Sequence, residues 1–246
     1  MKKSEKDEKF ATHIQGILHQ HQTMLGDGLR NKLLADVIKK VINSETSFLD
    51  IGAGSGVWAI LAAKLGAKRI VAVEVEECLI PVIYKHAQEN GVADRIEIIH
   101  GRSDDVKIRG KFDVIVSELF GGDAFGPDTV NMFKDIRDRF LAPDGILIPQ
   151  KLSLFAVPVR LENAVTDSLP IKGDFIASLA KNYSQNVSLA ERNRIKILSE
   201  PQKIVEIEFA TVEEPPSLTN LNANWQLKKS FRSQRHRDIS RIFVQR

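Results

Sequence analysis

Short runs of apolar, mostly β-branched residues alternate with longer segments of mixed polarity between residues 48 and 149. A short apolar run bounded by turn residues is typical of a buried strand, whereas apolar positions three and four residues apart indicate a helix. Strands that alternate with helices predict an α/β fold, in which a parallel sheet is covered on both faces. We expect strands at 48–51, 70–73, 96–99, 114–117 and 146–148, and helices at about 57–65, 77–90 and 129–140.

The pattern changes on both sides of this alternating region. Residues 9–42 carry apolar side chains at helical spacing. After Pro149 there are strand-like runs at 152–157 and 204–209, separated by prolines and by an irregular or helical excursion at about 164–192. We therefore expect three parts: an N-terminal helical segment (1–43), a cofactor-binding domain (44–150) and a β-rich domain with a basic C-terminal tail (151–246).

The segment FLDIGAGSGVWAILAAKLGAKRIVAVE, residues 48–74, carries the clearest chemical signal in the chain. A strand that contains Asp50 opens into a glycine loop, and a helix then leads to a second strand that ends at Glu74. Strand, glycine loop, helix, strand and carboxylate form the βαβ unit that binds an adenosine-bearing cofactor. The alternative is an ordinary turn with an incidental acid at a strand end, which a glycine motif alone does not exclude. The position of Glu74 favours the cofactor site.

The spacing of the glycines separates two classes of cofactor. A dinucleotide fingerprint has glycines at the first, third and sixth positions. Here glycines stand at the first, third and fifth positions, and Val57 replaces the last one. We therefore predict S-adenosyl-L-methionine, which has no pyrophosphate. Gly52 and Gly54 would let the main chain turn tightly against it, Asp50 would orient the loop or meet its ammonium group, and Glu74 would accept both ribose hydroxyls.

Composition is consistent with a soluble, cytoplasmic enzyme. Of the 246 residues, 43% are hydrophobic and 27% are charged, values typical of a globular protein with a sizeable core. No apolar stretch approaches the ~20 residues of a membrane span, the first ten residues lack the apolar run of a secretion signal, and a single cysteine, Cys78, fits a reducing compartment. Residues 226–246 hold seven Lys or Arg against Asp238. Because few aromatic residues accompany them, solvent exposure is favoured over nucleic-acid binding.

Several segments, in the same order, resemble those of the protein arginine methyltransferases across about residues 21–160, and more weakly to about 214. They are H-x-x-M-L-x-D-x-x-R at 21–30, the turn at 101–105, DVIVSELFG at 113–121, FLAPDGILIPQ at 140–150 and SEPQKIVEIEF at 199–209. The resemblance implies a Rossmann-like class I methyltransferase sheet, with N-terminal helices and a partial barrel-like β-rich domain. It also implies that Met24 packs near the cofactor sulfur, that Arg30 binds the cofactor carboxylate, and that Ser103 or Asp104 meets the adenine.

The activity implied by the resemblance is methyl transfer from S-adenosyl-L-methionine to arginine in a protein or peptide, or to a related nitrogen, which leaves S-adenosyl-L-homocysteine. This displacement needs mainly alignment and electrostatics. A guanidinium, whose pKa exceeds ~12, is aligned by carboxylates through bidentate hydrogen bonds. Glu118 matches the first of the family's two active-site glutamates. Its other interpretation is a carboxylate that serves the cofactor or a loop amide.

The chain also departs from the family pattern. Pro127 stands where the second glutamate is expected, and Asp128 is a nearby acid that we assign as a helper. About 96 residues follow Gln150, which is short for the family's usual barrel. A second hypothesis is therefore a cofactor-binding regulatory or scaffold protein without arginine methyltransferase activity. A methyltransferase for a small molecule or a nucleic acid ranks lower.

The expected partners follow from the same resemblance. We expect a protein or peptide substrate, no membrane association and no metal. Family members usually dimerise through an arm that projects from the barrel, and residues 161–192 are the candidate for that arm.

Overall fold

The computed structural model describes residues 5–120, 124–161, 195–219, 221–225 and 242–245. The chain divides into two compact units. The first comprises Met1–Gln150 with Glu208–Pro215, and the second comprises Lys151–Ile207 with Pro216–Arg246. The three predicted parts remain a prediction, although residues 208–215, which we placed in the C-terminal part, group with the first unit.

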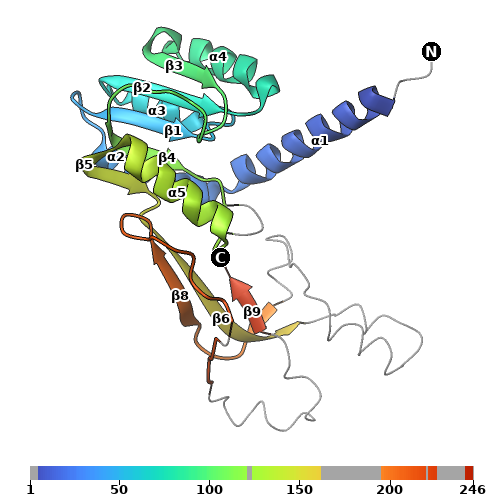
Figure 1. The fold of residues 1–246 in the computed structure, drawn as a ribbon. Helices are drawn as coiled ribbons and strands as arrows, with labels where there is room; N and C mark the ends of the chain where they lie inside the picture. The colour runs from blue at the N-terminus through green and yellow to red at the C-terminus, as the bar shows by residue number, and fades with distance from the viewer. Residues whose placement is uncertain (1–4, 121–123, 162–194, 220, 226–241, 246) are drawn as a thin grey trace. The chain divides into compact units, whose positions relative to one another are not determined.

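The first unit is built on a five-stranded parallel sheet with the order β3-β2-β1-β4-β5 (Figure 1). The order reverses between β1 and β4, and ligands of such sheets bind beyond the carboxyl ends of the strands at this point. All five predicted strands are present, which confirms the α/β class. Their bounds are β1 Ser47–Ile51, β2 Arg69–Glu74, β3 Ile96–His100, β4 Phe112–Ser117 and β5 Leu141–Ile148.

Strand β5 begins earlier than predicted. The sequence LAPDG interrupts the apolar pattern with polar and turn residues, so the expectation started only at residue 146. In the structure the register between β4 and β5 shifts between Phe112 and Val114, and the strand stays partly exposed until its last two residues. Such an irregularity lets a strand continue through a segment that reads as a turn.

The three helices predicted between the strands are present as α3 Val57–Lys64, η1 Glu77–Leu79 with α4 Ile80–Glu89, and α5 Pro127–Phe140. A short helix that was not predicted, η2 Ala93–Arg95, precedes β3. Helix α3 leads from β1 to β2 and buries Ala59, Ile60, Ala62 and Ala63. These small and branched side chains pack with Phe48 and Ile70 of the neighbouring strands in the hydrophobic core.

The N-terminal segment is helical but not continuous. Helix α1 spans Glu5–Gly26 and helix α2 spans Gly28–Val41. Asp27 separates them and caps α2, because its carboxylate accepts the backbone N–H of Arg30 at 3.0 Å. An aspartate at this position satisfies one of the free N–H groups of the first helical turn. The break between the two helices sets the position of Arg30, which lies in the first turn of α2.

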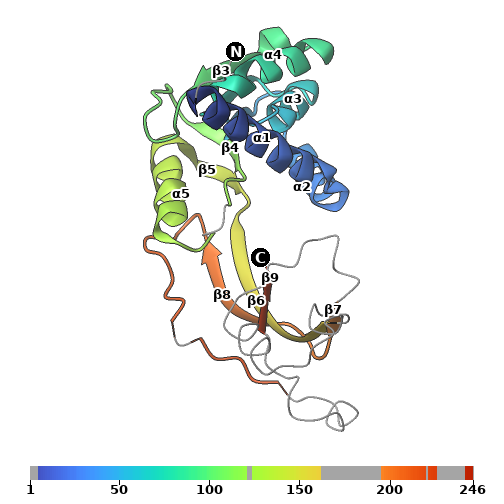
Figure 2. The same cartoon turned by 90° about the vertical axis from the view of Figure 1, so that its right-hand side faces the viewer.

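The second unit contains a small antiparallel sheet with the order β7-β6-β8, and β9 also pairs with β6 (Figure 2). Its strands are β6 Lys151–Leu161, β7 Ile195–Ile197, β8 Gln202–Glu208 and β9 Ile242–Gln245. The predicted β-rich character is confirmed. Strand β9 lies in a region that we expected to be only a basic tail. The predicted excursion at 164–192 lies outside the described residues.

No helix in the described part of the chain is long and apolar enough to cross a lipid bilayer.

Candidate active site

The glycine loop between β1 and α3 makes its turn with three residues in the left-handed region. Gly52, Gly54 and Gly56 have φ values of 75°, 56° and 80°, which L side chains rarely adopt. The space above the loop is also closed to a side chain. A Cβ atom on Gly54 would lie 2.5 Å from Cε1 of His21, and one on Gly52 would overlap the side chain of Leu119. The loop therefore requires glycine for both conformation and contact.

Asp50, in β1, fixes the start of the helix that follows the loop. Its side chain is buried, and Oδ2 accepts the backbone N–H of Ala59 at 3.1 Å. Burial raises the pKa of the Asp50 carboxyl to about 7; the hydrogen bond from Ala59 opposes this shift, and the charge of Glu74 adds to it. This contact is with α3 and not with the glycine loop itself, so the predicted role of Asp50 in orienting the loop or meeting the cofactor stays a prediction.

Glu74, at the end of β2, accepts hydrogen bonds from two separate backbone segments. Its Oε2 accepts the N–H of Gly54 at 2.6 Å, and its Oε1 accepts the N–H of Glu76 at 2.9 Å. Each carboxylate oxygen has two lone-pair sites, so both retain capacity for a ligand hydroxyl. The predicted contact of Glu74 with a ribose stays a prediction.

Arg30 and Glu118 pair with each other across the first unit. The Nε of Arg30 donates to Oε1 of Glu118 at 3.2 Å, and Nη2 forms an ion pair with Oε2. The side chains are 24% and 28% exposed. The guanidinium therefore meets the carboxylate side-on with two N–H groups, the bidentate arrangement typical of arginine. We had assigned these two residues to different ligands, and sequence reasoning did not predict the pair.

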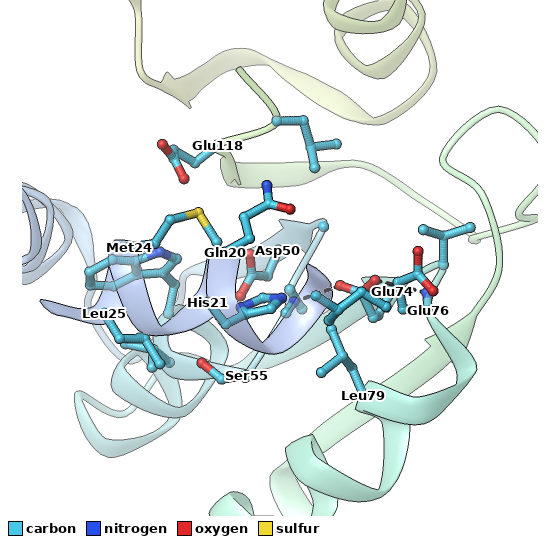
Figure 3. Close-up of a pocket in the computed structure, with 18 of the residues that line it drawn as sticks. Gln20, His21, Met24, Leu25, Asp50, Ser55, Glu74, Glu76, Leu79 and Glu118 are labelled. Carbon is cyan, nitrogen blue, oxygen red and sulfur yellow. Dashed lines mark hydrogen bonds between the residues drawn. The ribbon is translucent and has the colours of Figure 1, made fainter. Parts of the chain in front are cut away.

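The glycine loop, the strand ends and α1 enclose one pocket of about 310 Å³. Met24, Arg30, Asp50, Gly52, Gly54, Glu74 and Glu118 all line it, so the structure brings together most of the predicted site. Figure 3 shows Gln20, His21 and Met24 entering from α1, with Asp50 between Gln20 and His21 in this view, Glu74 to the right of His21, and Glu118 beyond the sulfur of Met24. The pocket lies at the switch point between β1 and β4.

Three predicted residues do not line this pocket. Asp104 is exposed and pairs with Arg102 at 3.0 Å, and the carbonyl of Ser103 accepts Nη1 of Arg139 at 2.8 Å. Asp128 is exposed in the first turn of α5. The structure thus supports neither an adenine contact from 103 or 104 nor a shared carboxylate site of Asp128 with Glu118.

Sequence reasoning assigned no role to several other lining residues. Ile17, Gln20, His21 and Leu25 recur with the predicted Met24 at spacings of three and four, so they lie on one face of α1 and all reach the pocket. This spacing in the sequence could have identified the face of α1 that lines the pocket. By contrast, Trp58 in α3, Leu79 in η1, and Glu76 and Phe120 in loops come from different elements, and no periodic pattern connects them.

The residues present fit an S-adenosyl cofactor. The loop is a cradle that a Cβ would fill, a buried carboxylate stands beside it at the end of β2, and Arg30 offers a guanidinium to a carboxylate. Ser117, which precedes Glu118, has a buried hydroxyl oxygen without a hydrogen-bond partner among the described residues. Sheet order, glycine loop and pocket together define the Rossmann-like fold of the class I methyltransferases.

Comparisons with known proteins agree with this class. The family model for "Ribosomal protein L11 methyltransferase (PrmA)" matches residues 31–148. "Probable protein arginine N-methyltransferase 6.2" of Oryza sativa subsp. indica is 28% identical over 205 residues, which cover 79% of this chain and 52% of the rice protein. "Ribosomal protein arginine N-methyltransferase rmt3" of Schizosaccharomyces pombe is 36% identical over 137 residues, which cover 54% of this chain and 25% of that protein.

Solved structures of the same kind share the fold. The Trypanosoma brucei PRMT1 enzyme–prozyme heterotetrameric complex with AdoHcy matches with a TM-score of 0.63 at 23% identity, covering 79% of this chain and 63% of that one. A crystal structure of PRMT6 with SAH matches with a TM-score of 0.62 at 17% identity, covering 80% and 67%. The predicted resemblance to the protein arginine methyltransferases is confirmed. The chain spans about half the length of the rice relative.

Proposed function

We propose that this chain is an S-adenosyl-L-methionine-dependent methyltransferase that acts on arginine in a protein or peptide, or on a related nitrogen. One observation carries the proposal. A single pocket at the switch point of the sheet joins a glycine cradle and a buried strand-end carboxylate to a second carboxylate, Glu118, which already holds a guanidinium in bidentate fashion. The sequence relatives named as arginine methyltransferases support the same substrate class.

Within the proposal, each wall of the pocket has a defined role toward the cofactor. The glycine loop and Asp50 lie against its methionine part, Glu74 accepts its ribose hydroxyls, and Met24 packs near its sulfur. Arg30 binds its carboxylate, for which a guanidinium fork is suited. When bound, the cofactor supplies an electrophilic methyl group, and its product is S-adenosyl-L-homocysteine.

Glu118 orients the nucleophile in this proposal. Its two oxygens already accept N–H groups of one planar guanidinium, that of Arg30. An arginine substrate would need the same two oxygens, so Arg30 must turn away from Glu118 before the substrate is gripped. A cofactor carboxylate would provide the alternative partner for Arg30. We therefore infer that cofactor binding precedes substrate binding.

The missing second glutamate limits how the substrate is held. Pro127 begins α5 at the position where the family has that glutamate, and Asp128 is exposed. Glu118 alone supplies a bidentate grip, and the remaining guanidinium N–H groups would bond to water or to main-chain carbonyls. This arrangement accommodates arginine as well as other planar nitrogen groups.

The partner of the reaction would be a protein or peptide, as the names of the relatives indicate for those proteins. A homodimer through residues 161–192 stays a prediction that lies outside the described residues. A cytoplasmic location also stays a prediction.

The proposal is tested by transfer of a radiolabelled methyl group to an arginine-rich peptide and to the same peptide with lysine at every arginine. We expect label in the arginine peptide alone, retained after acid precipitation. Glu118→Gln should lower transfer by about a hundredfold or more, because a charge-assisted bidentate contact is lost where the nucleophile is aligned. The same variant should keep its affinity for S-adenosyl-L-homocysteine.

Equal labelling of both peptides would contradict arginine as the substrate, and full activity of Glu118→Gln would contradict the role of Glu118. Cofactor binding without transfer to any peptide, protein or RNA would instead favour the cofactor-binding regulatory protein.

A further inference from the structure

The side-chain amide of Asn31 forms hydrogen bonds through both its oxygen and its nitrogen at the junction of α1 and α2. Its Oδ1 accepts Nη1 of Arg30 at 2.8 Å. Its Nδ2 donates to the carbonyl of Leu25 at 2.9 Å and to that of Met24 at 3.3 Å. A guanidinium only donates and a carbonyl only accepts, so the amide fits in one orientation. Asn31 therefore connects the guanidinium of Arg30 to the last turn of α1.

The two carbonyls lie where α1 ends. The last carbonyls of a helix have no partner within it and must be satisfied from outside. At the break, the carbonyl of Met24 accepts the N–H of Asp27 at 3.2 Å, and Asn31 reaches back from the first turn of α2 to bond this carbonyl and that of Leu25. The amide is thus anchored on its donor side by main-chain atoms, so its oxygen is fixed in space.

The anchored oxygen controls the direction of the Arg30 side chain. Nε and Nη2 of Arg30 face Glu118, while Nη1 faces Asn31. If Arg30 leaves Glu118 for another carboxylate, Asn31 still holds one end of the guanidinium. A side chain held in this way loses less conformational entropy on binding.

We infer that Asn31 is a positioning residue that holds Arg30 ready to bind the carboxylate of the cofactor. The inference rests on the proposed function, because it assigns Arg30 to that carboxylate. Asn31 directly follows Arg30, the last residue of the H-x-x-M-L-x-D-x-x-R pattern, and is not itself part of that pattern. An aspartate there would accept from Arg30 but could not donate to the carbonyls of α1.

The test compares two ligands by calorimetric titration of the full chain. S-adenosyl-L-homocysteine carries the carboxylate, and 5′-methylthioadenosine has the same nucleoside and sulfur without the amino acid. Asn31→Leu should weaken the first ligand about tenfold or more, since a hydrogen bond to a charged group is lost, and should change the second less than about twofold. Lys32→Ala should change neither, because Lys32 is exposed and pairs with Asp36.

A second pair of variants tests whether Asn31 acts through Arg30. In an Arg30→Met background, adding Asn31→Leu should not weaken S-adenosyl-L-homocysteine further, since a residue that acts only through another has no effect in its absence. Equal weakening of both ligands by Asn31→Leu, or a further loss in the Arg30→Met background, would overturn the inference and leave Asn31 a structural cap. Absence of wild-type binding to S-adenosyl-L-homocysteine would overturn the proposed function, and the inference with it.

Discussion

Asp50 and Glu74 are buried carboxylates on neighbouring strands, and they differ in the number of backbone N–H groups that they accept. Glu74 accepts two backbone N–H groups, one on each oxygen, whereas Asp50 accepts one from Ala59. Hydrogen bonds to the ionised form offset burial, and too few of them leave the neutral form favoured. Burial accordingly raises the pKa of the Asp50 carboxyl to about 7. The sequence predicted both acids from their strand ends, but not this difference, which depends on three-dimensional contacts.

Asp50 should make the stability of the first unit depend on pH. Its carboxyl titrates near 3.8 when unfolded and near 7 when folded, so between these values the folded chain binds more protons. The free energy of unfolding should therefore fall as pH rises through this window, by up to roughly 1.4 kcal/mol per pH unit. Asp50→Asn should remove this fall, and urea unfolding of both proteins at pH 5, 6, 7 and 8 measures it.

Asp113 provides a control, because the pKa of its carboxyl is shifted in the direction opposite to that of Asp50. Hydrogen bonds from the backbone and side chain of Ser47 lower the pKa of its carboxyl. The stability gained from this shift is fully present above the unfolded pKa of 3.8 and is lost only as pH falls below it, so Asp113→Asn should be destabilised relative to wild type by a constant amount between pH 5 and 8. If the stability of Asp50→Asn relative to wild type does not increase with pH, the carboxyl of Asp50 is not protonated in the folded state.

At the scale of elements, the sequence predicted the strands and helices of the first unit because each has its own periodic pattern. It did not predict how α1 lies over the glycine loop. That placement depends on the break at Asp27 and on single contacts such as His21 against Gly54, which have no local sequence signal. The pocket gathers the predicted residues Asp50, Glu74 and Glu118, whereas Ser103, Asp104 and Asp128 do not line it, and the roles of all six stay predictions.

Gly54→Ala should separate α1 from the loop. The added methyl group would lie 2.5 Å from Cε1 of His21, and the backbone φ of +56° is strained for alanine. We expect roughly a tenfold or greater loss of affinity for S-adenosyl-L-homocysteine, a change of about 1.4 kcal/mol or more. Adding His21→Ala removes the clash and should recover part of that loss. Calorimetry on the two variants tests this, and unchanged binding by Gly54→Ala would show that the loop does not contact the ligand.

At the scale of the whole molecule, residues 208–215 belong to the first unit, although the chain before them belongs to the second unit. The side chain of Phe209 is fully buried, and its ring stacks on that of Phe133 with a centroid distance of 3.9 Å. Phe133 in turn stacks on Phe120, which lines the pocket. Arg137 secures the same segment by donating to the carbonyl of Val212 at 2.9 Å. No sequence pattern predicted this return, because the segment follows a strand of the second unit.

Phe209→Ala should destabilise the first unit by about 3–5 kcal/mol, the usual cost of removing a buried aromatic ring. Phe10→Ala, at a site that is 64% exposed, is the matched control and should change stability by less than about 0.5 kcal/mol. Denaturant unfolding followed by the fluorescence of Trp58, which belongs to the first unit, in a Trp225→Phe background that removes the second tryptophan, measures both. An equally small effect of the two substitutions would mean that residues 208–215 are not part of the core.

The most direct test of the central claim is calorimetric titration of the purified chain with S-adenosyl-L-methionine and S-adenosyl-L-homocysteine, with NAD as the control ligand. We expect micromolar binding of the first two and none of NAD. Glu74→Ala should weaken binding at least about tenfold through loss of a charged hydrogen-bonding group, while Glu97→Ala, at an exposed position of the adjacent strand β3, should bind as wild type does. Absence of binding by either S-adenosyl ligand would contradict the claim that this pocket is a cofactor site.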